Sequence, residues 1–160
     1  MAHNLKLGIY QFTLRNQIDK DYLTFDEVLK KVAKTSNEKS KKYQEFVKLY
    51  IESFNGQFAK SQDKTKSLIP LKIDSNSNKN LIFGMLKGGL TEIEREIYED
   101  HNPSERIGII HKNNITTLPY YFLIWTPVDL DFGILMIQYY SSNSISSPFI
   151  DNLKLFFREQ

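Results

Sequence analysis

The segment YQEFVKLYIESF, residues 43–54, carries the most regular pattern in the chain. Its apolar side chains fall at positions i, i+3, i+4, i+7, i+8 and i+11, namely Tyr43, Phe46, Val47, Tyr50, Ile51 and Phe54. Because an α-helix turns once in about 3.6 residues, this spacing places all of them on one helical face. Asn55-Gly56 follows as a typical helix stop. The segment predicts an amphipathic helix whose aromatic face packs against a sheet.

Two further helices are expected, one before this segment and one at the end of the chain. Thr24 and Glu27 have the spacing of the N-cap and N3 residues in a capping box. Apolar residues follow them at helical spacing as far as about Lys34. Ser147-Pro148 matches the preferences of the N-cap and N1 positions, and a strongly apolar face continues from there to Phe157. The chain therefore contains a helical pair and a closing helix.

Strand patterns occupy most of the remaining sequence. Leu5–Leu14 alternates between apolar and other residues, as a strand does. Further strands are expected at 69–73, 81–86, 106–111, 115–125 and 132–140. Pro70 has no amide donor, which favours an edge strand, and Gly88-Gly89 is typical of a hairpin turn. Residues 91–98 fit either a helix or a strand, and the turns on both sides favour a strand.

Together these patterns predict a single α+β domain spanning residues 1–160. Its sheet is an antiparallel meander of about five to seven strands, with the helical pair inserted after the first strand and a C-terminal helix. The length of 160 residues is usual for one domain with one core. Such a domain either stands alone or forms the N-terminal part of a longer protein.

The composition excludes several chemistries. There is no cysteine, so disulfides, thiolate metal sites and cysteine nucleophiles are absent. His3, His101 and His111 lie far apart in the sequence, so we expect neither a metal site nor a cofactor. The longest apolar run, residues 120–125, is far shorter than the roughly 20 residues that cross a bilayer. The first residues lack the apolar segment of a signal peptide, so we expect a cytoplasmic location and no membrane partner.

Positive charge is concentrated in the first half of the chain. Residues 1–80 contain 15 Lys and Arg against 9 Asp and Glu, a net +6, whereas residues 81–160 contain 6 against 10, a net −4. Seven lysines lie within 19 residues that include only two acids, and we take them as candidate binding residues: Lys30, Lys31, Lys34, Lys39, Lys41, Lys42 and Lys48. Such a segment binds phosphates, binds an acidic protein or forms a solvated helix face. Its lack of arginine favours a protein partner over nucleic acid.

Two Arg–His pairs suggest an enzymatic alternative. Arg95 with His101, and Arg106 with His111, resemble the loosely spaced Arg–His motif of HEPN ribonucleases. That resemblance implies metal-independent RNA cleavage by a histidine at the end of a strand. In the HEPN family the motif lies on a helical bundle, whereas both pairs here fall in or beside predicted strands. The other interpretation is that the arginines balance the acidic run from Glu92 to Asp100.

A second resemblance concerns the last quarter of the chain. PYYFLIWTP at residues 119–127, GILMIQ at 133–138 and the segment 144–157 resemble a pattern in uncharacterised bacterial proteins carried near mobile elements and phage-defence loci. The resemblance covers residues 119–157 and transfers no functional residue. The hypothesis is a non-enzymatic bacterial binding module, with phage defence as a candidate role, that engages a protein or a nucleic acid. A ribonuclease-like enzyme is the alternative.

Overall fold

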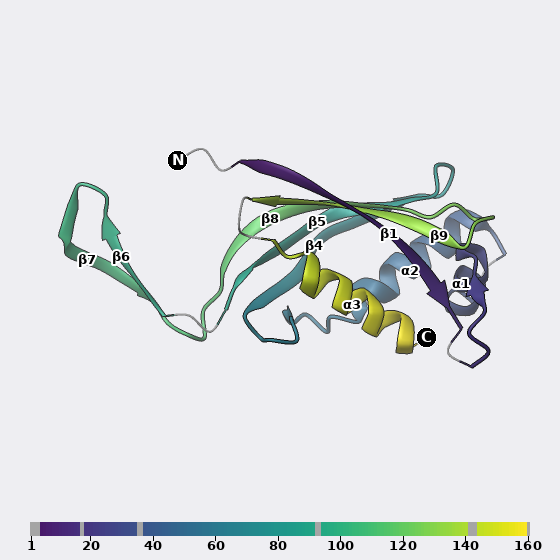
Figure 1. Cartoon of the computed structure of the whole chain (residues 1–160), viewed down its shortest axis with the longest axis horizontal. Coiled ribbons are helices and arrows are strands. Elements are labelled where there is room, and N and C mark those ends of the chain that lie inside the picture. The colour runs from purple at the N-terminus through teal and green to yellow at the C-terminus, as the bar shows by residue number, and fades with distance from the viewer. Residues whose placement is uncertain (1–3, 17, 35–36, 92–93, 141–143, 160) are drawn as a thin grey trace.

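The computed structural model describes residues 4–16, 18–34, 37–91, 94–140 and 144–159. A curled antiparallel sheet of seven strands forms its centre, in the order β2-β1-β9-β8-β5-β4-β3 (Figure 1). The strands are β1 (Leu5–Arg15), β2 (Tyr22–Leu23), β3 (Ala59–Lys60), β4 (Lys66–Asn76), β5 (Leu81–Leu90), β8 (Thr116–Trp125) and β9 (Phe132–Tyr140). The predicted α+β architecture with an antiparallel sheet is confirmed.

Two further strands leave the sheet as an arm. β6 (Arg95–Glu99) and β7 (Asn102–Ile110) pair only with each other and project from one end of the body (Figure 1). The preference for a strand at 91–98 is thus confirmed for Arg95–Tyr98, while residues 92 and 93 lie outside the described part. The hairpin turn expected at Gly88-Gly89 is wrong, because both glycines lie inside β5. A Cβ at Gly89 would overlap the carbonyl oxygen of Thr116, so glycine permits close strand pairing there.

Three helices lie on the same side of the sheet (Figure 1). They are α1 (Phe25–Val32), α2 (Lys39–Glu52) and α3 (Ser146–Glu159). The expected capping box starts α1: the Thr24 amide donates to Glu27 Oε2 at 2.8 Å, and the Glu27 amide donates to Thr24 Oγ1 at 3.4 Å. The helical pair follows β1 after a two-residue strand, and α3 closes the chain as predicted.

The aromatic face of α2 forms the centre of the core. Phe46 and Tyr50 pack edge-on against Phe156 of α3, with ring centroids 5.4 and 5.3 Å apart. The Tyr43 hydroxyl lies 2.8 Å from Thr126 Oγ1, at the end of β8, and so ties α2 to the sheet. The predicted stripe is buried except for Ile51, which is 39% exposed. The periodic pattern therefore located both the helix and its buried face.

The apolar row of β1 points away from the helices. Leu5, Leu7 and Ile9 are 62%, 58% and 61% exposed. The alternate residues Phe12 and Leu14 pack against the core instead. The strand is confirmed at 5–15, but its most regular apolar row lies on the outer face of the sheet, because the helices pack against the other face.

We expect Tyr50→Ala to lower the free energy of unfolding by about 2–4 kcal/mol, because it empties a fully buried aromatic site. Tyr50→Phe should cost about 1 kcal/mol, since its hydroxyl donates to Asn152 Oδ1 at 2.8 Å. Ile51→Ala on the exposed side of α2 serves as the control and should change stability by about 0.5 kcal/mol or less. Urea unfolding measures all three, and similar values for Tyr50→Ala and Ile51→Ala would contradict this account of the core.

Candidate protein-binding face

The seven candidate lysines do not form one free basic surface. Three pair with acids on or beside their own helix: Lys30 Nζ with Asp26 at 2.6 Å, Lys41 with Glu38 at 2.9 Å and Lys48 with Glu52 at 3.8 Å. The hydrogen bond that the Lys30 ammonium donates to Asp26 raises the pKa of Lys30. Lys39 Nζ donates to Asn80 Oδ1 at 2.6 Å.

The remaining three lysines differ in exposure. Lys42 is only 9% exposed, so its aliphatic stem packs at the border of the core. Lys31 and Lys34 are exposed and have no ion pair within the described residues. The lysine-rich segment therefore offers few unpaired cations for a row of phosphates.

The two candidate histidines lie at the ends of the arm strands. His101 and His111 are both exposed, and His111 Nδ1 lies 3.8 Å from Glu94 Oε2. Arg106 pairs with Glu96 at 3.0 Å. This arginine therefore offsets one acid of the run from Glu92 to Asp100, as the second interpretation expects. Neither histidine lines any of the five best-formed pockets of the described chain. Among the described residues, no three His, Asp or Glu side chains are grouped to hold a metal ion.

We expect the purified protein to leave single-stranded RNA intact at neutral pH, with or without Mg²⁺. A general base must lie within reach of a bound substrate, and both histidines are exposed on the arm and line none of those five pockets. Gel analysis of labelled RNA checks this. Cleavage by the wild-type protein that disappears in His111→Ala or His101→Ala would instead support the ribonuclease hypothesis.

A broad apolar surface covers the side of the sheet that the helices leave open. Strand pairing aligns outward side chains in rows across β1, β9, β8 and β5. One row comprises Ile9, Met136, Leu123 and Phe83, and the next comprises Gln11, Ile134, Trp125 and Leu81. On the other side of the first row, Leu7 lies opposite Gln138, and Tyr121 lies opposite Met85. We call this surface, with Leu5 at its end, the outer face.

The outer face is nearly free of charge. Between Leu5 and Thr13, and along β9 and β8, no outward position carries Lys, Arg, Asp or Glu. Charged residues of this face occur only toward its β4 margin, at Lys72, Asp74 and Lys87. An antiparallel sheet that faces water usually alternates apolar inward and polar outward residues. Both faces of these strands are apolar, so the outer face departs from the pattern of a solvated sheet.

The size of the outer face is that of an interaction surface. Pairing joins all four strands over the positions Gly8–Gln11, and the β1–β9 pair and the β5–β8 pair each continue beyond them. At about 4.8 Å between strands and 3.4 Å per residue, the projected area is roughly 350–400 Å². The largest apolar patch on a typical monomer is roughly 300–600 Å² and is often functional. Tyr121, 57% exposed, lies within the outer face, and aromatic residues are enriched in the centres of protein interfaces.

One sequence pattern did indicate the outer face, but it was interpreted only as a sign of a buried strand. Residues 81–86 are apolar on both faces, which predicted a buried central strand. β5 is indeed central, between β4 and β8, but Phe83 is 38% exposed because no element of the described chain covers that side. A run that is apolar on both faces in an antiparallel sheet therefore indicates a covering element or a partner.

Comparison with family models, with curated proteins and with solved structures gave no match for this chain. In the part of the chain that the structure describes, no helix is both long and apolar enough to cross a bilayer.

Proposed function

We propose that the protein is a non-enzymatic binding module that engages a protein partner through the outer face. The observation that carries the proposal is the contiguous, uncharged apolar surface across four paired strands, with Leu5, Leu7 and Ile9 each more than half exposed. Removing such a surface from water favours association at about 25 cal/mol per Å² of apolar area. A protein surface supplies the apolar complement that this requires.

The shape and charge of the outer face specify the chemistry of the partner. The sheet curls around the helices, so the outer face is its convex side (Figure 1). Two convex faces touch over only a small area, which favours a different protein with a concave apolar surface over a second copy of this chain. Because the centre of the outer face carries no charge, the matching part of the partner is uncharged as well. The resemblance of residues 119–157 to proteins of phage-defence loci supplies a candidate cellular setting, and a cytoplasmic location stays a prediction.

Site-specific photo-crosslinking tests this proposal. We expect p-benzoylphenylalanine at Leu7 or Tyr121 to capture the same heavier polypeptide in the cells that make the protein. The same probe at Gln44, exposed on α2, is the matched control and should capture nothing in common with them. The captured protein is then produced alone, and its affinity is measured against the wild type and against a Leu7→Ser, Ile9→Ser double variant.

The double variant should bind the partner at least tenfold more weakly, a change of about 1.4 kcal/mol. Its thermal midpoint should stay close to that of the wild type, because both side chains are exposed. Sedimentation of the purified wild type should show a monomer. Crosslinks to a second copy alone, equal capture at Gln44 or unchanged affinity of the double variant would each overturn the proposal.

The structure also supports a prediction about nucleic acid. At about 50 mM salt and micromolar protein, we expect no shift of labelled duplex DNA or RNA, because several of the candidate lysines are paired or buried. A protein that neutralises several phosphates shows binding that falls steeply with salt. A salt-dependent shift that Lys31→Glu and Lys34→Glu abolish would show that the unpaired lysines bind phosphates after all.

A further inference from the structure

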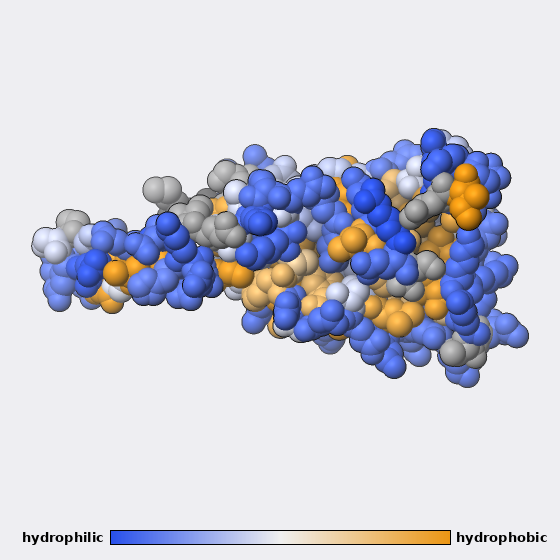
Figure 2. Space-filling view, turned by 90° about the horizontal axis from the view of Figure 1, so that it is seen from below, coloured by the Kyte–Doolittle hydropathy of each residue, from blue (hydrophilic) through white to orange (hydrophobic). Residues whose placement is uncertain are grey.

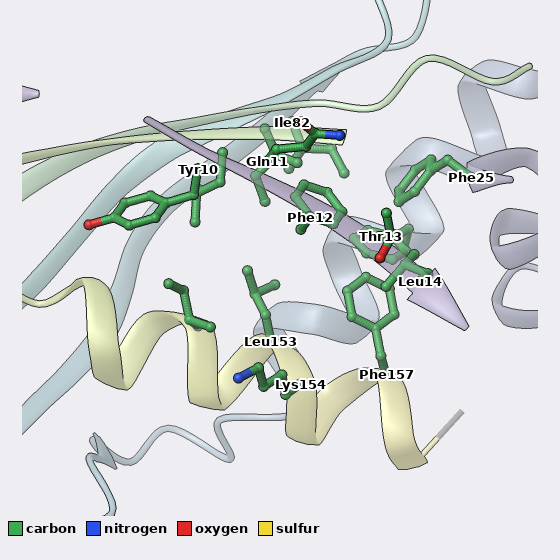
Figure 3. A pocket seen from close by; sticks show the side chains of 14 residues that line it. Tyr10, Gln11, Phe12, Thr13, Leu14, Phe25, Ile82, Leu153, Lys154 and Phe157 are labelled. Atoms are coloured by element: carbon green, nitrogen blue, oxygen red, sulfur yellow. The ribbon is translucent and has the colours of Figure 1, made fainter. Parts of the chain in front are cut away.

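An apolar groove lies between β1 and α3, on the side of the sheet opposite the outer face. Its pocket measures about 270 Å³. Phe12 and Leu14 of β1 form one wall, and Leu153 and Phe157 of α3 point toward them (Figure 3). Inward residues of the sheet, including Ile82, form the floor. Lys154 is the only charged residue in the lining.

A second pocket continues this groove. It measures about 330 Å³ and shares Leu14 and Phe157 with the first. Three cationic residues line it and no acid does: Arg15, Lys31 and Arg158. The groove therefore runs from an apolar part under β1 to a positively charged part near the ends of β1 and α3. In the space-filling view of the helix side, apolar residues lie between hydrophilic ones on the body (Figure 2).

The three cations are available to an anion. Arg15 stacks on the ring of Tyr22, with Cζ 4.2 Å from the ring centroid, and also donates to its hydroxyl. This contact positions a guanidinium that has five donor hydrogens in all. Lys31 and Arg158 form no ion pair with a described residue.

The acids on neighbouring segments are engaged elsewhere. Glu27 Oε2 accepts hydrogen bonds from the amide and the hydroxyl of Thr24, at 2.8 and 2.9 Å. Asp19 accepts from the Asn16 amide group at 3.0 Å and from the Asp21 amide at 3.2 Å. Neither carboxylate lines the cationic pocket, although Glu27 interacts electrostatically with Lys31, so the positive charge of the pocket is only partly offset.

We propose that this groove binds a carboxylate carried on a flexible apolar chain, such as an alkanoate. The chain occupies the pocket under β1, and the carboxylate lies among Arg15, Lys31 and Arg158. Guanidinium groups match the geometry of a carboxylate and bind it through paired hydrogen bonds. The apolar lining is complementary to the chain of this ligand, and the cationic end is complementary to its carboxylate. A purely polar or a purely apolar ligand would match only one of these two parts of the groove.

The size of the apolar pocket supports this assignment. An apolar cavity of about 150 Å³ is enough to hold benzene, and the pocket under β1 is larger. Its volume equals roughly nine groups of about 30 Å³, the space of a water molecule in the liquid, and a methylene group is of similar size. Decanoate is therefore a suitable probe, and decanol, which has the same chain without the charge, is its matched control.

The experiment is a titration of the whole protein with decanoate and, separately, with decanol. Binding is measured by calorimetry and by NMR of isoleucine and leucine methyl groups. We expect saturable binding of decanoate, with shifts at Leu14, Ile150 and Leu153, and at least tenfold weaker binding of decanol. Arg158→Glu combined with Lys31→Glu should weaken decanoate about tenfold or more and leave decanol unchanged. Lys79→Glu, exposed in the turn between β4 and β5 and outside both pockets, is the control and should change neither.

A second variant tests the apolar part of the groove. Leu153→Trp fills the pocket at a half-buried position and should abolish binding of both probes, with the fold checked by its thermal midpoint. No saturable binding of decanoate by the wild type would overturn the proposal. So would equal affinity for decanoate and decanol, or a loss caused by Lys79→Glu and not by the reversal of Arg158 and Lys31. Binding at the outer face does not enter these measurements, so either proposal stands or fails independently of the other.

Discussion

The packing of the aromatic face of α2 against α3 and the sheet determines the rest of this structure. Phe46 and Tyr50 meet Phe156 edge-on, and all three side chains are almost completely buried. Edge-to-face aromatic pairs add about 0.5–1.5 kcal/mol each beyond the area they bury. This cluster holds the helices on one side of the seven-stranded sheet and thereby decides which face of its strands is the core.

That one-sided arrangement leaves two features that a fully covered sheet would lack. The opposite face of β1, β9, β8 and β5 stays apolar and open, because the described chain has no element to cover it. On the helix side, α3 lies against β1 without closing the space between them, so the groove remains. Both features meet at β1, which presents Ile9 to the outer face and Phe12 to the groove.

Sequence patterns could predict the elements and the buried face of α2, but not which faces of the strands are exposed. The helical stripe of residues 43–54 and the Thr24–Glu27 capping box depend on local spacing, and both are confirmed. The direction of β1 could not be read from its alternation, because Leu7 and Phe12 lie on opposite faces and both are apolar. The groove joins Arg15, Lys31 and Arg158 from three distant segments, which only the fold brings together. Likewise, the burial of Lys42 depends on which way α2 is turned.

In the part of the chain that the structure describes, the edge of β1 is largely unpaired, and this bears on the proposed partner of the outer face. Between Leu5 and Thr13 the strand pairs with β9 on one side, and on the other side β2 reaches only Leu14 and Arg15. Proteins usually protect such an edge with proline, several charges or a bulge, and this stretch holds one lysine and none of the other devices. A protein seated on Leu5, Leu7 and Ile9 would cover the apolar face and shield the adjacent edge. The proposed partner would therefore protect both the apolar face and the open edge of β1.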